Sequence, residues 1–315
     1  MIPLEEVRAA RERLAGKVVR TPLVRLRAPE HSGAIYLKLE NLQPIGSFKL
    51  RGALNAVMQE DLNRLRTGVI TASAGNMGQG VAWAARELEV RCTVVVPEGA
   101  APTKLAAIEA LGGRVVVVPY ERWWQAISES SFPEVEGVFI HPVQDERVMA
   151  GNGTIGLEIL EDLSEVDAVL VPFGGGGLSV GIASAVKGLQ PDVQVYAVEP
   201  ETGAPLTAAL NEGEPRPVDY QASFVDGSGA PALLPKMWSL ARGVLDGAFS
   251  VSLEDTAAAV RMLVERARVV AEGAGALALA AALAGRAGNG HVVCIVSGGN
   301  IDTPKLAKIL GGEVP

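Results

Sequence analysis

Short apolar runs without polar alternation recur along the chain, and they limit the possible folds more than any other feature. From Val69 onward the pattern of strand, turn and helix repeats. Strands without alternation are buried on both faces, which is typical of parallel sheets covered by helices. With 315 residues, the sequence therefore predicts an α/β fold of two three-layer αβα domains with open, mostly parallel twisted sheets. The predicted strands are residues 35–39, 69–72, 92–96, 114–118, 138–140, 168–171, 193–198 and 292–296.

Charge and hydropathy exclude several classes of partner. The formal net charge of −8 argues against a nucleic acid or an anionic membrane surface as the main ligand. The most apolar run, residues 273–285, is shorter than the roughly 20 residues that span a bilayer. The amino terminus is charged and helical in pattern, unlike a signal peptide. We therefore expect a cytoplasmic protein with no membrane partner.

Cysteine and histidine offer little chemistry. Cys92 and Cys294 lie in separate apolar, strand-like runs, so we expect two buried thiols and neither a disulfide nor a zinc site. His31, His141 and His291 show no metal-ligand spacing and lie beside no candidate nucleophile. Catalysis that depends on histidine is therefore not expected.

Four consecutive glycines follow the predicted strand at residues 168–171 and precede a segment rich in small, helix-compatible residues. Bare backbone N–H groups at the start of a helix form an anion site, and glycine permits the conformations that bring them together. The next residues are Leu178 and Ser179, whereas a P-loop requires Lys and then Ser or Thr. This glycine turn (residues 174–177) therefore predicts a site for a single phosphate group, with a merely flexible turn as the alternative.

Lys49 lies in an electrostatically unusual place. Gly46 and Ser47 are typical of a helix start, with Ser47 as the expected N-cap, so Lys49 falls in the first turn. The positive end of the helix dipole, the neighbouring Arg51 and partial burial all favour a neutral amine. A neutral lysine amine can form a Schiff base with an aldehyde. On this segment alone, a solvated surface lysine remains the alternative.

Polar or glycine-rich clusters follow four predicted strands, at residues 73–76, 174–177, 199 and 297–300. In open parallel sheets ligands bind beyond the carboxyl ends of the strands, so these clusters predict one shared site. Residues 151–156 match the dinucleotide pattern G-x-G-x-x-G, but the charged segment ahead of them is not a strand. We expect a helix start there instead, which places Asn152 near a ligand.

Together these segments resemble the fold-type II pyridoxal-phosphate enzymes, in particular the threonine/serine dehydratase and serine racemase branch of the tryptophan synthase β-like family. The resemblance runs from Thr21 to Asp302. It implies a large cofactor-binding domain of residues 1–50 and 145–315 and a small mobile domain of residues 51–144. Its most specific motifs are S-F-K-L-R-G at 47–52, S-A-G-N at 73–76, G-G-G-G-L at 174–178 and S-G-G-N at 297–300.

The resemblance implies a role for each matching residue. Lys49 would bind the aldehyde of pyridoxal 5′-phosphate and later take the substrate α-proton, while Phe48 and Gly227 would pack on the two faces of the pyridine ring. Further cofactor contacts would come from Asn76 at the 3′-oxygen, from Gly174, Gly175, Gly176, Gly177 and Leu178 at the phosphate, and from Ser297 at the ring nitrogen. The substrate carboxylate would lie on Ser73, Ala74, Gly75, Asn76 and Met77, with Asn152 nearby.

The implied reaction is β-elimination from L-threonine or L-serine, which yields 2-oxobutanoate or pyruvate and ammonia. Three positions depart from the pattern of the branch. Ala74 stands where serine racemases place a second serine, which favours dehydration over racemisation because alanine has no proton to give. Met77 replaces a frequent histidine. Pro205 replaces an acidic metal ligand, so a divalent metal is not favoured, with Glu199 and Gly203 as the weak candidates.

Several alternatives stay open. Serine racemase, 3-hydroxyaspartate dehydratase, cysteine synthase and threonine synthase share the cofactor and differ in substrate or reaction. A non-catalytic protein that binds an amino acid or phosphate would use the same glycine turn. We expect specificity to depend on Met77, Trp123 and the loop at residues 219–235, with the Trp123–Trp124 pair either a substrate wall or part of the core. A homodimer is implied by the resemblance alone.

Overall fold

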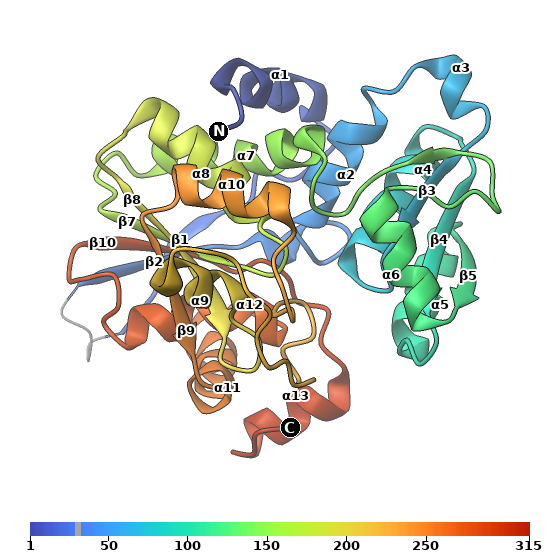
Figure 1. The fold of residues 1–315 in the computed structure, drawn as a ribbon. Coiled ribbons are helices and arrows are strands. Elements are labelled where there is room, and N and C mark those ends of the chain that lie inside the picture. Colours follow the sequence, from blue (N-terminus) through green and yellow to red (C-terminus); the bar gives the residue numbers. More distant parts are fainter. Residues whose placement is uncertain (29–32) are drawn as a thin grey trace.

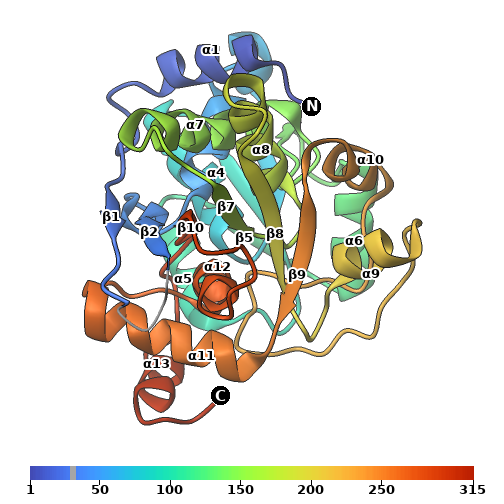
Figure 2. The ribbon, with the colours of Figure 1, turned by 90° about the vertical axis from the view of Figure 1, so that its left-hand side faces the viewer.

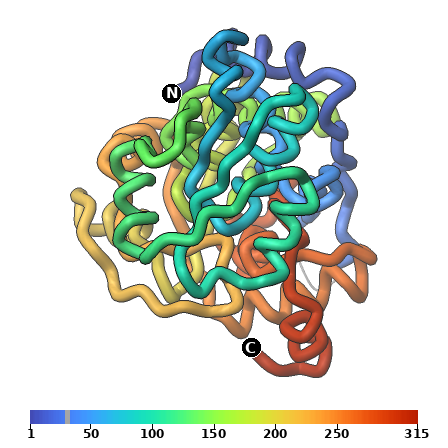
Figure 3. Tube along the Cα trace, turned by 90° about the vertical axis from the view of Figure 1, so that its right-hand side faces the viewer, coloured from blue at the N-terminus to red at the C-terminus, as the bar shows by residue number. Residues whose placement is uncertain are grey.

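The computed structural model describes residues 1–28 and 33–315, so His31 lies outside the described residues. The described chain forms two sheets, and each sheet lies between helices (Figure 1). Figure 3 views the molecule from the side of the smaller sheet, whose elements lie in front of the larger sheet. This is the predicted α/β architecture of two open, mostly parallel sheets.

The larger sheet has six strands and is parallel except at one edge. In spatial order the strands are β1 (Leu23–Arg25), β2 (Ala34–Lys38), β10 (His291–Ile295), β7 (Ala168–Pro172), β8 (Gln194–Pro200) and β9 (Gly247–Val251). Only β1 among them is antiparallel to its neighbour, β2. The strands β7 and β10 are buried along most or all of their length, as their lack of polar alternation predicts.

Helices cover both faces of the six-stranded sheet (Figure 2). One face packs against α1 (Leu4–Leu14), α7 (Glu146–Asp162), α8 (Gly177–Leu189) and α10 (Pro235–Val244). The other packs against α11 (Leu253–Met262) and α12 (Gly273–Leu283). Helix α12 is rich in alanine and glycine and almost entirely buried, which lets it lie close to the strands. Shorter elements of the same part are η1 (Glu40–Leu42), α9 (Pro205–Glu212), η2 (Leu263–Ala267) and α13 (Thr303–Leu310).

The smaller sheet has four parallel strands. Their spatial order is β5 (Arg114–Val118), β4 (Cys92–Pro97), β3 (Val69–Ala72) and β6 (Val138–Phe139). Helices α2 (Lys49–Val57), α4 (Asn76–Glu87) and α5 (Pro102–Ala110) pack on one face, and α6 (Tyr120–Glu129) packs on the other. A short helix, α3 (Leu62–Leu65), precedes β3.

All the predicted strands are present, with ends shifted by at most two residues. The edge strands β1 and β9 were not predicted, because β1 has only three residues and β9 is half-exposed over most of its length. The boundaries of the two domains at residues 51 and 144 stay a prediction, as does the mobility of the smaller one. Among the described helices, none combines the length and apolarity that crossing a bilayer requires.

The segment that matches G-x-G-x-x-G lies inside helix α7, which begins at Glu146 with Asp145 as its N-cap. The prediction of a helix start at residues 151–156 was therefore wrong. Its glycines instead permit close helix packing, because a Cβ atom on Gly151 would lie 2.5 Å from the Arg51 carbonyl oxygen, and one on Gly153 would lie 2.8 Å from that of Gly181. The motif thus joins α7 to α2 and α8 and binds no dinucleotide phosphate.

A buried ion network ties α2 to the six-stranded sheet. The Arg51 guanidinium donates hydrogen bonds to Glu40 and Glu158, and the Lys38 ammonium lies 2.6 Å from Glu158. Burial alone would raise the pKa of Glu40, but the charge and hydrogen bonds of Arg51 hold that pKa below its usual value. The network fixes the helix that carries Lys49 against strand β2 and helix α7.

Candidate active site

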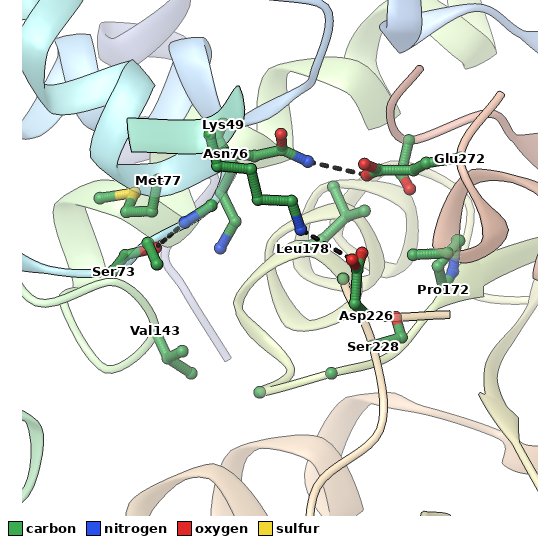
Figure 4. A pocket seen from close by; sticks show the side chains of 18 of the residues that line it. Lys49, Ser73, Asn76, Met77, Val143, Pro172, Leu178, Asp226, Ser228 and Glu272 are labelled. Atoms are coloured by element: carbon green, nitrogen blue, oxygen red, sulfur yellow. Dashed lines mark hydrogen bonds and ion pairs between the residues drawn. The ribbon is translucent and has the colours of Figure 1, made fainter. Parts of the chain in front are cut away.

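A cavity of about 470 Å³ lies between the two sheets, at the carboxyl ends of β3, β4, β7 and β10 (Figure 4). The four motifs that the sequence singles out all contribute to its wall. Of the predicted site residues, those that line it are Phe48, Lys49, Ser73, Ala74, Gly75, Asn76, Met77, Gly174, Gly175, Gly176, Gly177, Leu178, Gly227 and Ser297. The cavity is thus at the sheet edge where parallel α/β folds bind ligands.

Five helices of the described chain begin at this cavity or beside it. Helix α2 starts at Lys49, α4 at Asn76, α5 at Pro102, α8 at Gly177 and α12 at Gly273. The first N–H groups of a helix have no acceptor within the helix, and the aligned peptide dipoles place partial positive charge there. The wall of the cavity is therefore suited to a ligand that carries more than one anionic group.

Lys49 is the first residue of α2, and its amine donates a hydrogen bond to the Pro142 carbonyl oxygen at 3.2 Å. Burial lowers the pKa of Lys49 to about 8, while the charge of Glu272 acts in the opposite direction. The predicted direction of the shift is confirmed. Arg51, however, is not among its causes, because the guanidinium charge is neutralised by Glu40 and Glu158.

Ser47 does not cap helix α2, so that prediction was wrong. Phe48 is the N-cap residue and no side chain caps the helix, while the Ser47 hydroxyl is buried without a hydrogen-bond partner among the described residues. Ser47 instead forms a β-bridge with Gly298, and the Phe48 N–H donates to the Ser297 carbonyl oxygen at 3.0 Å. These backbone contacts join the Lys49 segment to the turn after β10.

The glycine turn connects β7 to α8. Gly176 is the N-cap residue of α8 with φ of 94°, a left-handed conformation that glycine adopts without strain. A Cβ atom on Gly175 would lie 2.5 Å from a Val143 methyl carbon, and one on Gly177 would lie 3.1 Å from the Val143 carbonyl oxygen. A side chain at Gly175 is therefore excluded unless Val143 moves, and the contact at Gly177 is tight. The turn lies at the start of α8 and lines the cavity, which is where backbone N–H groups can bind a phosphate.

The turn at residues 73–76 leads into α4 and is held by two contacts. The Gly75 N–H donates to the Ser73 hydroxyl at 3.3 Å. The Asn76 side-chain amide donates to Glu272 at 2.7 Å (Figure 4). Its oxygen accepts from the Asn300 amide at 2.8 Å. Asn76 is thus oriented by residues of the larger sheet.

Glu272 is a cavity residue that the sequence did not single out. It immediately precedes α12, is 95% buried, and lies so close to Gly227 that a Cβ atom there would be 3.3 Å from its carboxylate oxygen. Burial, reinforced by the charge of Asp226, raises the pKa of Glu272 to about 7. No pattern of residue types marks this position, since only the fold brings residue 272 to residue 76.

Asp226 and Lys104 close one side of the cavity. The Lys104 ammonium of α5 lies 2.8 Å from Asp226, which precedes Gly227. A second contact joins the same elements, because the Thr103 hydroxyl donates to Asp302 at 2.9 Å. The two parts of the molecule therefore meet at α5 through polar groups at the rim.

Asn152 does not line the cavity. It lies inside helix α7, is 1% exposed, and its amide donates to the Gly177 carbonyl oxygen at 3.3 Å. The expectation that Asn152 contacts the substrate followed from the wrong helix start and has no support in its position. Its contact with Gly177 instead ties α7 to the first residue of α8.

Glu199, one of the weak metal candidates, caps a helix. Its carboxylate accepts hydrogen bonds from the N–H groups of Leu206 and Thr207, at 3.0 and 2.7 Å, and from the Thr207 hydroxyl at 2.7 Å. These donors belong to the first turn of α9, which follows Gly203. Within residues 1–28 and 33–315, no three His, Cys, Asp or Glu side chains are grouped as metal ligands.

Comparisons with known proteins agree with this arrangement. The family model described as pyridoxal-phosphate dependent enzyme matches residues 14–298. The L-threonine ammonia-lyase of Thermotoga maritima is 38% identical over 315 residues, which cover 98% of this chain and 78% of that protein. The structure of maize serine racemase has a TM-score of 0.90 and 29% identity and covers 98% of this chain and 97% of that chain. Threonine deaminase isoform 2 of Solanum lycopersicum has a TM-score of 0.89 and 32% identity, with 98% and 87% covered. The chain belongs to the family of pyridoxal-phosphate dependent enzymes.

Proposed function

We propose that the chain is an ammonia-lyase that converts L-threonine to 2-oxobutanoate and ammonia, and L-serine to pyruvate and ammonia. Water leaves the substrate in the elimination and is taken up again in the release of ammonia, so the atoms balance. The observation that carries the proposal is the Lys49 amine, whose pKa is lowered by burial, in one cavity with the glycine turn. The names of the Thermotoga and Solanum relatives support the choice of substrate.

The residues of the cavity fit pyridoxal phosphate. The glycine turn offers bare N–H groups at the start of α8, and a Cβ atom at Gly175 or Gly176 would lie within 3.0 Å of a neighbour, which suits close approach of a phosphate group. Lys49 offers an amine whose neutral form is accessible near neutral pH, which suits an aldehyde. Ser297 is a buried hydroxyl at the end of β10 and suits a ring nitrogen without forcing its protonation.

The cofactor, when bound, supplies an electron-withdrawing group that makes the substrate α-hydrogen acidic. In this proposal the Lys49 amine takes that proton, and the buried cavity keeps water from competing for it. The turn at residues 73–77 binds the substrate carboxylate through the N–H groups at the start of α4. Asn76 is held in place by Glu272 and Asn300, so its amide is fixed where it would contact the cofactor ring at the 3′-oxygen.

A test of the proposal compares Lys49→Ala with Lys187→Ala. Lys187 pairs with Asp246 and does not line the cavity, so its variant is the matched control. We expect the first variant to lose ketoacid release by at least about 10³-fold, since it lacks the amine that takes the proton. In the wild-type protein, borohydride reduction followed by mass spectrometry should place the pyridoxyl group on the peptide that contains Lys49. A pyridoxyl group on another peptide, or ketoacid release that persists in Lys49→Ala, would exclude the proposed role.

Racemisation of serine is the second candidate, favoured by the similarity to maize serine racemase. Ala74 lines the cavity but has no proton to return to the α-carbon, so we propose elimination as the main reaction. Chiral chromatography of the serine that remains after partial reaction measures the ratio of D-serine to pyruvate. We expect Ala74→Ser to raise this ratio, and a ratio above one in the wild-type protein would make racemisation the main activity.

We further propose that the protein is a cytoplasmic homodimer. The two cysteine thiols are free and buried, as suits a reducing compartment. The dimer is proposed on the resemblance alone. Light scattering coupled to size-exclusion chromatography would give the mass in solution, and a monomeric mass at micromolar concentration would contradict this part of the proposal.

A further inference from the structure

A second cavity opens beside Lys49 and differs in character from the first. Its volume is about 370 Å³, and it adjoins the first cavity. The residues that line both cavities are Lys49, Ser73, Met77, Trp123, Val143, Gly174, Gly175, Asp226, Gly227 and Ser228. Because both volumes meet at the amine and at the turn proposed to bind the substrate carboxylate, a substrate at Lys49 lies at their junction. The second cavity is therefore the space available to the substituent on the substrate β-carbon.

The walls of this second cavity are aromatic and apolar. Helix α6 contributes Tyr120, Trp123 and Trp124, whose rings follow one another with centroids 5.5 and 6.3 Å apart. Tyr220 and the segment at residues 230–234, which is alanine, proline, alanine and two leucines, also line the cavity. Its charged lining residues within the described chain are Lys49 and Asp226, and Asp226 is already paired with Lys104.

The size of the second cavity and its apolar walls both argue against threonine or serine as the substrate that fills it best. A methyl group is about as large as a water molecule, roughly 30 Å³, so the substituent of threonine would leave most of this volume unfilled. Serine carries only hydrogen atoms in addition to its hydroxyl. An apolar substituent would displace water from aromatic walls, which is the main source of affinity in apolar pockets. Aromatic rings also pack favourably against Trp and Tyr side chains.

We propose that the preferred substrates are 2-amino-3-hydroxy acids with a bulky apolar substituent on the β-carbon, and aryl substituents in particular. This inference rests on the proposed elimination reaction and specifies its substrate class. For 3-phenylserine, water is lost between the α- and β-carbons and then consumed as ammonia is released, which gives phenylpyruvate and ammonia. The lining of Trp123, Trp124 and Tyr220 then serves as the binding site of the phenyl ring.

The experiment measures kcat/KM of the holoenzyme for L-serine, L-threonine and both β-epimers of L-3-phenylserine, with ammonia release as the common assay. We expect the better phenylserine epimer to exceed L-threonine by at least about 10-fold, the lower end of the discrimination that an apolar pocket provides. Activity on threonine with none on phenylserine would overturn the inference and leave the proposed function intact. No ammonia from any of the four would overturn the proposed function instead.

A binding measurement keeps the inference testable in that last case. L-Phenylalanine and L-alanine lack the β-hydroxyl group and cannot lose water, and they differ only in the phenyl group. The difference between their affinities for the holoenzyme, measured by calorimetry, therefore reports occupancy of the second cavity. We expect L-phenylalanine to bind at least about 10-fold more tightly than L-alanine. Equal affinities would mean that the aromatic walls close on one another when a substrate binds, and would overturn the inference.

Variants of Trp123 test whether the preference for phenylserine arises in the second cavity. We expect Trp123→Ala to lower the ratio of the phenylserine kcat/KM to the threonine kcat/KM by at least about 5-fold, and Trp123→Phe to restore most of it. Trp83 of α4, which stacks with Arg86 and lines neither cavity, is the matched control, and Trp83→Phe should leave the ratio unchanged. A ratio that Trp123→Ala leaves unaltered would place the phenyl ring elsewhere. If that variant does not fold, Trp124→Ala gives the same comparison.

Discussion

The Asn76 amide donates a hydrogen bond to the Glu272 carboxylate at 2.7 Å, across the cavity that separates the two sheets. Asn76 begins α4, beside the four-stranded sheet, and Glu272 precedes α12, beneath the six-stranded sheet. The bond thus couples the two parts of the molecule at the candidate active site. Since burial lowers the pKa of Lys49 and the charge of Glu272 partly opposes this lowering, this carboxyl group influences both the geometry and the protonation of the site.

Replacing Glu272 with Gln should change the pH dependence of cofactor loading. The neutral Lys49 amine reacts with an aldehyde, so the loading rate of the apoprotein should rise with pH and level off above the Lys49 pKa of about 8. Glu272→Gln removes the negative charge that opposes the lowering of the Lys49 pKa. The midpoint of the pH dependence of the loading rate should therefore move to lower pH. Stopped-flow absorbance after mixing with pyridoxal phosphate measures it. Asn76→Ala, which keeps the carboxylate, is the control, and an unmoved midpoint in Glu272→Gln would contradict this account.

Adding a methyl group at Gly175 should weaken cofactor binding. The new Cβ would lie 2.5 Å from a Val143 methyl carbon, and overpacking by one methyl typically costs about 1–3 kcal/mol. Val143→Ala removes the clashing atoms, so the double variant should recover most of the affinity lost in Gly175→Ala. Equilibrium titration of each apoprotein with pyridoxal phosphate measures the affinities. Failure of the second substitution to restore binding would mean that the turn loses affinity for another reason.

His141 should make the stability depend on pH. Its Nδ1 accepts from the N–H groups of Val143 and Gln144, and burial lowers its pKa to about 4 from 6.5. The unfolded chain therefore takes up a proton as the pH falls below about 6.5 while the folded protein does not, so stability is lost down to about pH 4 and then levels off. At about pH 5 the loss is about 2 kcal/mol.

The pH dependence that comes from His141 must be separated from that of Glu272, which has the opposite sign. Comparing the wild-type protein with His141→Asn isolates the His141 contribution to stability. The raised pKa of Glu272 makes the folded protein take up a proton first, which adds stability as the pH falls through about 7. Urea unfolding at about pH 8 and pH 5 gives the free energy of unfolding of both proteins, and thus the advantage of the wild-type protein over His141→Asn at each pH. We expect the wild-type advantage to shrink at the lower pH, and an advantage that stays constant would show that His141 does not titrate in this range.

Removing Arg51 should destabilise the protein strongly. Its guanidinium is 1% exposed and bridges Glu40 and Glu158, and breaking a buried pair typically costs about 3–5 kcal/mol because a carboxylate is left unpaired. Urea unfolding of Arg51→Met measures this loss, and Glu40→Gln in the same chain should recover part of it. The exposed Arg216–Glu214 pair is the control, and Arg216→Ala should leave the unfolding midpoint unchanged.

Much of the fold follows from local patterns in the sequence. Strand β7 is a continuous apolar run and β3 is interrupted only by Thr71, and the turns after both contain glycine, so their positions could be predicted from the residues alone. The phosphate site at the glycine turn could likewise be predicted, because four consecutive glycines after a strand are typical of such a site. Edge strand β9 lacks such a pattern, because one side of it faces no neighbouring strand and its residues are only partly buried.

The parts of the site that were missed depend on tertiary contacts. Glu272 is a single acid in an otherwise apolar segment. The Pro142 carbonyl that accepts from Lys49 is a backbone group, so its role cannot be predicted from residue type. Ser47 has the right type for an N-cap, yet pairing with Gly298 fixes its backbone in a bridge instead. Asn152 follows a glycine in a familiar motif, but those glycines serve helix packing.

The five helix starts around the cavity affect how a phosphorylated ligand approaches. The chain as a whole carries a formal charge of −8, so at a distance an anion is repelled, and only within about one Debye length of the cavity do the helix ends attract it. Added salt screens the distant repulsion while leaving close contacts largely intact. Capture of the cofactor should therefore become faster as ionic strength rises, the reverse of the behaviour of sites that draw in their ligands by long-range attraction.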